Sequence, residues 1–208
     1  MSGANGPAYT SIVGGGANGC ILHYIENKDM LKNGDLVLID AGCEYEDYAS
    51  DITRTFPVNG KFSDEQAAIY DIVLKALKEA IDVTQPGTPY NKTNETTIRV
   101  ITEGLVELGL LKGDINDLIK AEAHREFYMH GAGHWLGLDV HDVGDYKIDG
   151  EWRIYEPGMV VTIEPGIYIS PKNKKVDTKW RGIGVRIEDD IVITKTGNIN
   201  LTSKVPKE

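Results

Sequence analysis

Three histidines stand within twelve positions of the sequence, as His130, His134 and His141 in the stretch MHGAGHWLGLDVHD. Histidine is the side chain whose charge changes nearest neutral pH, and its neutral imidazole is a common metal ligand. His130 and His134 have the spacing of the helical HExxH zinc motif, but no Glu follows His130 and the glycines argue against a helix. The stretch therefore predicts a loop that supplies metal ligands or groups facing a substrate.

Two carboxylates stand at the ends of apolar runs in the first quarter of the chain. Asp40 closes the run LVLID, and Asp51 opens DITRTFPV, in which β-branched and aromatic residues nearly alternate. If these runs pair as a hairpin around a four-residue turn, Glu44 to Asp47, then Asp40 lies directly opposite Asp51, with Cβ atoms about 4.5–5.5 Å apart. Two such carboxylates repel each other, so one interpretation is a solvated rim and the other is a compensating positive charge.

A second acidic pair stands near the C-terminal end. Glu164 lies inside VVTIEPGIYI and Glu188 inside VRIEDDIVI, both among β-branched apolar residues on strands that we expect to be neighbours. A single Glu in a strand usually faces water. Four carboxylates that converged on one cavity without counterions would have raised pKa values and would weaken the fold, whereas two divalent cations would cancel their charge.

A metal centre would explain the histidine stretch. His134 would supply the one nitrogen ligand, with Gly131 and Gly133 letting the backbone approach the metals. His130 and His141 would then face the substrate. Oxygen ligands with one imidazole suit Mn²⁺, Co²⁺ or Fe²⁺, and Zn²⁺ is a further candidate. The chain has two cysteines, which excludes a zinc site built on thiolates.

The elements that must position these residues follow the order strands, helices, strands, which predicts an α+β fold with a curved antiparallel sheet. The first twenty residues are glycine-rich and predict a loop that enters a short strand at CILHY. Between the two acidic pairs, Ser63 and Gln66 form a capping-box pattern before a helix that Pro86-Gly87 ends. A second helix is predicted over 91–108, stopped by glycine, and a third from Asp114.

Composition bounds the class of protein. With 208 residues and 41% hydrophobic side chains, we expect one globular domain over residues 1–208, with two compact halves as the alternative. The net charge of −10 repels phosphate, which argues against nucleic acid as a partner. No apolar run approaches the roughly 18 residues of a membrane span, so no membrane partner is expected. Two cysteines and the lack of a charged-then-apolar leader favour the cytoplasm.

The candidate ligands stand in motifs whose order resembles that of the proline-specific metallopeptidases of the pita-bread fold. The resemblance is closest to the Xaa-Pro aminopeptidases (aminopeptidase P), with prolidase near, and it runs from about Tyr9 to Leu201. It rests on LVLIDAG, SDITRTFPV, HGAGHWLGLDVHD, TIEPGIYI and RGIGVRIEDD. It implies a sheet with helices on its outer face and two metal ions, usually Mn²⁺, held by Asp40, Asp51, His134, Glu164 and Glu188.

The resemblance also implies roles around the metals. The implied catalytic residues are His23 (in CILHY), His130, His141 and Glu164. Glu164 would carry a proton from water to the leaving nitrogen, and His141 would donate to the developing oxyanion. Tyr168 and Arg186 would bind substrate near the proline ring, although a salt bridge between Arg186 and the ligands is an alternative.

The implied substrates are peptides with proline in the second position, from which the first residue is removed. Intact aminopeptidases P carry an N-terminal domain, and their catalytic domain begins upstream of the point where this chain starts. We therefore expect a catalytic domain that lacks the first part of its N-terminal half. The extra domain contributes to the homo-oligomer expected of the intact protein.

Three alternatives stay open. A prolidase would act on Xaa-Pro dipeptides. Methionine aminopeptidase shares the five ligands but typically lacks a histidine four residues before the ligand histidine and an arginine two residues before the last glutamate. Here His130 and Arg186 occupy those places, which favours proline specificity. A catalytically silent fragment or binding module is the alternative outside enzymes, although such relatives lose ligands and all five are present here.

Overall fold

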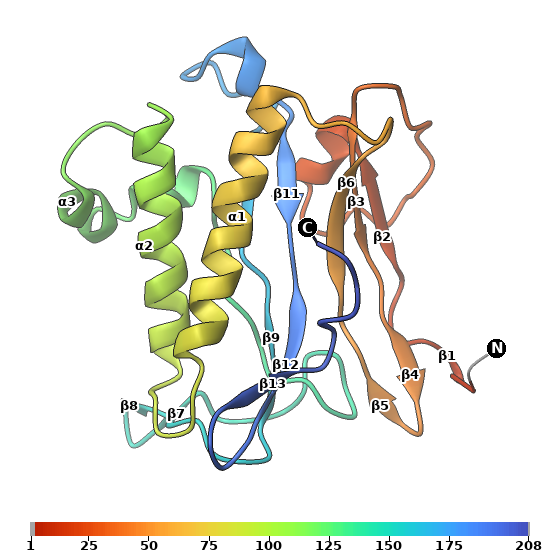
Figure 1. Cartoon of the computed structure of the whole chain (residues 1–208), viewed down its shortest axis with the longest axis vertical. Coiled ribbons are helices and arrows are strands. Elements are labelled where there is room, and N and C mark those ends of the chain that lie inside the picture. Colours follow the sequence, from red (N-terminus) through yellow and green to blue (C-terminus); the bar gives the residue numbers. More distant parts are fainter. Residues whose placement is uncertain (1–2, 208) are drawn as a thin grey trace.

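The first hairpin is built from antiparallel strands near the N-terminus in the computed structural model, which describes residues 3–207 (Figure 1). One sheet has the order β2-β3-β6, with β2 (Ile12–Gly15), β3 (Leu36–Asp40) and β6 (Thr53–Pro57). The hairpin continues through β4 (Cys43–Tyr45) and β5 (Tyr48–Ala49), and β1 (Gly6–Pro7) pairs with β4. The predicted pairing of the two apolar runs is confirmed.

The turn of this hairpin differs from the prediction. Glu46 and Asp47 have φ values of 49° and 70°, so the turn has two left-handed residues, the type that matches the twist of the strands. The resulting register places Asp40 opposite Thr53. The predicted four-residue turn and the direct Asp40–Asp51 pair were therefore wrong. Because the register differs by an even number of residues, both carboxylates still belong to one face of the hairpin.

The glycine-rich N-terminal stretch contains two short strands, β1 and β2, and a 3₁₀ helix in place of the predicted loop. Strand β2 lies within it, and η1 (Gly16–Cys20) follows directly. Gly16 has a φ of 54°, which lets the chain turn out of β2 into η1. The strand predicted at CILHY was wrong, because residues 21–28 form no strand.

Two long helices lie side by side and cover one side of the strands (Figure 1). α1 (Asp64–Val83) begins with the predicted capping box, in which Gln66 N donates to Ser63 Oγ and Ser63 N donates to Gln66 Oε1. α2 (Asn91–Glu107) ends before Gly109, whose φ is 72°, and α3 (Ile115–Lys120) follows. The residues of α1 that are buried in the main core are Ile69, Tyr70, Val73, Ala76, Leu77 and Ala80.

The second hairpin pairs four strands near the C-terminal end. β9 (Val160–Ile163) pairs with β12 (Asp189–Ile193), and β10 (Gly166–Tyr168) pairs with β11 (Gly184–Arg186). Both ladders share one register, so Glu164 and Glu188 stand opposite each other in the gap between them. The remaining elements are β13 (Asn198–Asn200), which pairs with β12, a small hairpin of β7 (Lys147–Ile148) and β8 (Glu151–Trp152), η2 (Ala123–Glu126) and η3 (Thr178–Trp180).

The two hairpins meet where β6 contacts β11. Thr55 Oγ1 donates to Arg186 O at 2.9 Å and accepts from Arg186 N at 3.2 Å. The strand pairs that the structure describes are antiparallel and the long helices lie together on one side, which confirms the α+β class. Within residues 3–207, no helix combines the length and apolar character that a membrane crossing needs.

Candidate metal centre

A cavity of about 280 Å³ opens at the junction of the two hairpins. Its walls carry every residue that the sequence predicted for the site except Tyr168. Those residues are His23, Asp40, Asp51, His130, His134, His141, Glu164, Arg186 and Glu188. The topology therefore brings both acidic pairs and the histidine stretch to one place, as predicted.

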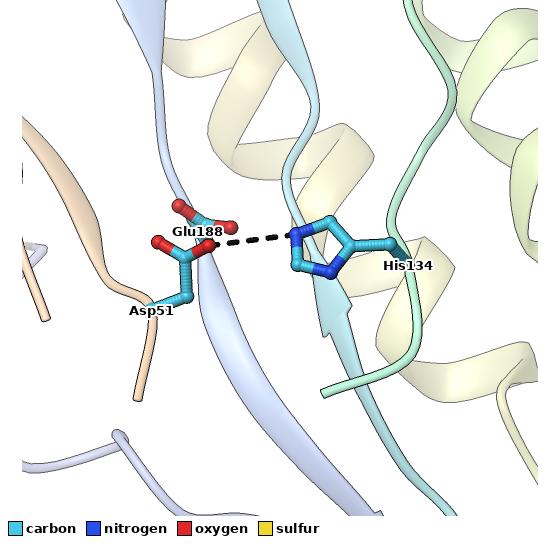
Figure 2. Close-up of side chains that lie close together, drawn as sticks. All are labelled: Asp51, His134 and Glu188. Atoms are coloured by element: carbon cyan, nitrogen blue, oxygen red, sulfur yellow. Dashed lines mark ion pairs between the residues drawn. The ribbon is translucent and has the colours of Figure 1, made fainter. Parts of the chain in front are cut away.

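Three of the predicted ligands are close enough to share one cation. Ligand atoms of Asp51, His134 and Glu188 all lie within 4.8 Å of one another, and the three residues are buried. Figure 2 shows the two carboxylates side by side, facing the imidazole, although the three residues come from separate parts of the chain. His134 Nε2 lies 3.4 Å from Asp51 Oδ2 and 3.7 Å from Glu164 Oε1.

The backbone decides which nitrogen of His134 faces the cavity. Nδ1 donates to Trp135 O at 2.9 Å, because a carbonyl oxygen can only accept, and this leaves Nε2 as the ligand atom. His134 N donates to Thr162 Oγ1, and Thr162 N donates to His134 O. This close approach requires Gly133, where a Cβ would lie 1.8 Å from Thr162 O. A Cβ on Gly131 would meet its nearest neighbour at 4.0 Å, so no contact demands glycine there.

Asp40 and Asp51 share a hydrogen-bond partner that the sequence analysis missed. Tyr9 Oη lies 2.5 Å from Asp40 Oδ1 and 2.5 Å from Asp51 Oδ1, and its single hydrogen serves one of them at a time. Burial raises the pKa of Asp40. Burial acts the same way on Asp51, but hydrogen bonds from His134 and Tyr9 outweigh it, so the pKa of Asp51 is lowered.

The second acidic pair is short of positive charge. Burial raises the pKa of Glu164 to about 7 and raises the pKa of Glu188 well above its ordinary value. Among the residues that line the cavity, four carboxylates face one permanent cation, the guanidinium of Arg186. Oxygen donors in excess, together with the Nε2 of His134, fit divalent cations of intermediate hardness.

A buried hydrogen-bond chain runs from Asp40 to the histidine stretch. Arg186 Nη2 donates to Asp40 Oδ2 at 2.6 Å, so the salt bridge considered as an alternative is present. Arg186 Nη1 donates to Tyr168 Oη at 3.1 Å, and Tyr168 lies 2.8 Å from His130 Nε2. His130 Nδ1 donates to Gly131 O, so Nε2 must accept from Tyr168. Burial lowers the pKa of His130 to about 4, which keeps this ring neutral at pH 7.

The other two histidines lie at the mouth of the cavity. His141 and His23 are exposed, and the ring of His141 lies 4.1 Å from that of His134, between centroids. Burial and the neighbouring His134 lower the pKa of His141. At neutral pH His141 is therefore an uncharged donor or acceptor beside the candidate ligand.

Two further polar residues behind the ligands were not anticipated. Thr53 Oγ1 donates to Glu188 Oε2 at 2.6 Å. Asp190 Oδ2 accepts from Asp51 N at 3.2 Å, and burial raises the pKa of Asp190 to about 7. The sequence did hold a signal for Asp190, because strand alternation puts it on the face of Glu188, two residues earlier.

The comparison with known proteins agrees with this geometry. Residues 1–195 match the model of metallopeptidase family M24. The chain belongs to this family. It is 59% identical over 206 residues to the Xaa-Pro aminopeptidase of Escherichia coli (strain K12), which covers 99% of this chain and 46% of that protein. It is 60% identical over 202 residues to the Xaa-Pro aminopeptidase of Haemophilus influenzae, with 97% and 46% covered.

A solved structure shows the same fold. The aminopeptidase PepP of Pseudomonas aeruginosa superimposes with a TM-score of 0.98 at 63% identity, covering 99% of this chain and 47% of that one. The resemblance to aminopeptidase P and the pita-bread fold are thereby confirmed. This M24 chain spans about half the length of the curated relatives it matches.

Proposed function

We propose that this M24 chain is the catalytic part of a two-metal aminopeptidase that removes the first residue from peptides with proline in the second position. The observation that carries the proposal is the meeting of Asp51, His134 and Glu188 within 4.8 Å. Asp40 and Glu164 line the same cavity. The Xaa-Pro aminopeptidases to which the chain is similar support the substrate class.

The proposed cofactor is a pair of divalent cations, with Mn²⁺ as the first choice and Co²⁺, Fe²⁺ or Zn²⁺ as further candidates. The residues proposed to hold them are Asp40, Asp51, His134, Glu164 and Glu188. When bound, such cations polarise a peptide carbonyl and lower the pKa of water.

Glu164 is the residue proposed to move a proton during the reaction. Its carboxylate lines the cavity, where it could take a proton from water and pass it on. The nitrogen of an Xaa-Pro bond has no hydrogen and must gain one to leave. Glu164 Oε2 lies 3.8 Å from His130 Nδ1, which already donates its hydrogen to Gly131 O, so the proton would stay on the Glu164 carboxylate until the leaving nitrogen takes it.

The histidines and Tyr168 are proposed to orient the substrate. His141, neutral and at the mouth, is placed to donate to the developing oxyanion, and His23 lies on the same rim. Tyr168 is 2% exposed and lies behind His130, so we propose that it orients this imidazole. Arg186, bound to Asp40, is proposed to orient a ligand as well as to line the pocket.

Metal affinity is expected to fall as the pH falls. Glu164, with a pKa of about 7, takes up a proton in the metal-free cavity as the pH falls through neutrality, and a cation must displace it; burial raises the pKa of Glu188 in the same direction. Because the raised pKa of Glu164 favours its protonated form below about pH 7, the apparent Mn²⁺ affinity should drop there by about tenfold per pH unit for each displaced proton. Titration calorimetry from about pH 8 to about pH 6, in buffers of different ionisation enthalpy, measures affinity and proton release together. An affinity that does not change over this range would contradict the prediction.

A substrate panel tests the proposed function. The metal-free chain is incubated with Mn²⁺, Co²⁺ or Zn²⁺ and with Xaa-Pro-Yaa, Xaa-Pro and Met-Ala peptides, and the released amino acid is measured. We expect release from Xaa-Pro-Yaa in the presence of Mn²⁺ and none after chelation. Cleavage confined to Xaa-Pro would indicate a prolidase, and cleavage confined to Met-Ala would indicate a methionine aminopeptidase. Metal binding without any cleavage would indicate a catalytically silent fragment.

We propose a compartment and an assembly from the composition of the chain and from its resemblance to aminopeptidases P. The cytoplasm is the proposed location, and a homo-oligomer is the proposed state of the intact protein. Peptides are the proposed partners, because the chain is similar to Xaa-Pro aminopeptidases. The net charge of −10 separately disfavours nucleic acid.

A further inference from the structure

Glu188 lies in a gap between two strand ladders, and residues of the other hairpin hold its backbone. The ladder of β10 and β11 ends at Arg186, and the ladder of β12 and β9 begins at Asp189. Glu188 N donates to Thr53 O at 3.1 Å, and Glu188 O accepts from Arg54 Nη1 at 2.6 Å. Two adjacent residues of β6 therefore supply the backbone bonds that a strand partner would otherwise provide.

Arg54 is buried, with 3% of its surface exposed, and it forms bonds in two directions. Toward the cavity, Nη1 reaches Glu188 O. Away from the cavity, Nη2 donates to Val205 O at 3.0 Å and Nε donates to Pro206 O at 3.2 Å. Nη2 also forms a buried ion pair with Asp189 Oδ1 at 2.7 Å. A rigid guanidinium with five donors can serve these acceptors together, whereas a lysine ammonium is a single point charge.

Residues 201–207 form a C-terminal strap that runs up across the junction of the two hairpins, in dark blue in Figure 1. Thr202 Oγ1 donates to Asp189 Oδ1 at 2.8 Å, and Lys207 Nζ lies 2.8 Å from Asp189 Oδ2. Tyr70 of α1 donates to Lys207 O at 2.8 Å. The strap is thus tied to the buried carboxylate of Asp189 at both ends and to helix α1 at its far end.

We propose that Arg54 is a positioning residue for the metal ligand Glu188 and that the C-terminal strap holds Arg54 in place. The inference rests on the proposed two-metal function. The C=O of Glu188 has no strand partner other than Arg54, so loss of this bond would let the backbone at Glu188 move and carry the carboxylate away from Asp51 and His134. The end of the sequence therefore controls the metal centre, although residues 201–207 do not line the cavity.

Arg54→Lys is the test variant, because it keeps the charge opposite Asp189 and removes the forked geometry. Arg181→Lys is the matched control. Arg181 also binds a loop carbonyl, Val176 O, through Nε at 3.1 Å and Nη2 at 2.8 Å, and it does not line the cavity.

Each variant of the 208-residue chain is measured by Mn²⁺ calorimetry, by kcat and KM on an Xaa-Pro-Yaa peptide, and by hydrogen exchange of the amides of residues 186–190. We expect Arg54→Lys to lose about 10- to 100-fold in Mn²⁺ affinity, to lose kcat more than it raises KM, and to exchange faster at 186–190. Arg181→Lys should match the wild type.

The outcomes separate this inference from the proposed function. Wild-type Mn²⁺ affinity and wild-type exchange in Arg54→Lys, even with a lower Tm, would overturn the inference and leave Arg54 as a packing residue. If Arg54→Lys does not fold, Lys207→Met at the far end of the strap takes its place, with a smaller loss in the same direction expected and no loss overturning the inference. A wild-type chain that binds no Mn²⁺ would contradict the proposed function, and exchange at residues 186–190 would still show whether Arg54 holds Glu188.

Discussion

Replacing Asp51 with asparagine is expected to weaken Mn²⁺ binding by at least about 100-fold and to reduce peptide hydrolysis to the background rate. The lowered pKa of Asp51 keeps this carboxylate ionised at neutral pH, whereas burial raises the pKa of Glu188. Asp51 is also one of the three candidate ligands whose ligand atoms lie within 4.8 Å of one another. An amide keeps the size and the hydrogen bond to Tyr9 but removes the charge, so calorimetry and peptide release measure the loss of charge itself.

Asp47→Asn is the matched control for this variant. Asp47 lies on the same hairpin, is exposed, and has a φ of 70°, a conformation that asparagine also adopts readily. The control should keep wild-type metal affinity and turnover. Wild-type activity in Asp51→Asn would remove Asp51 from the metal centre.

Replacing Arg186 with methionine is expected to lower the free energy of unfolding of the metal-free protein by about 3–5 kcal/mol, a fall in Tm of roughly 10 °C. The guanidinium is 3% exposed and pairs with Asp40 Oδ2 at 2.6 Å, so its removal leaves a buried carboxylate without its cation. It also removes the bonds to Tyr168 Oη and Thr53 Oγ1. Denaturant or thermal unfolding measures the loss.

Mn²⁺ provides an internal check on that result. A cation bound near Asp40 would replace part of the lost positive charge, so the difference in Tm between Arg186→Met and the wild type should shrink when Mn²⁺ is added. Arg99→Met is the control, because Arg99 forms an exposed i,i+4 pair with Glu103 and should change stability by less than about 0.5 kcal/mol. An Arg186→Met protein as stable as this control would contradict the account of a buried charge network.

The site was predictable where a charge interrupts an apolar strand. Asp40, Asp51, Glu164 and Glu188 each stand among β-branched residues, and burial of such a charge demands a compensating group. The capping box at Ser63 was likewise explicit in the local sequence and is confirmed. These features depend on residues close together in the chain, which is why a single sequence is enough to find them.

The features that could not be predicted from the sequence depend on backbone conformation and on contacts between segments far apart in the chain. The register of the first hairpin was wrong because Glu46 and Asp47 adopt left-handed backbone without the Asn-Gly pattern that usually marks such a turn. Tyr9 was missed because the glycine-rich stretch around it has no period, so nothing indicated a side chain aimed at Asp40. Arg54 stands between two threonines in β6, a pattern that predicts a side chain facing water. In the structure the C-terminal strap covers this side chain and buries it.

An anomalous difference map from crystals of this chain grown with Mn²⁺ tests the central claim most directly. We expect two manganese peaks inside the cavity, bound by side chains from both hairpins and by Nε2 of His134. Peaks confined to the surface, or an empty cavity at a Mn²⁺ concentration that supports peptide cleavage, would contradict it.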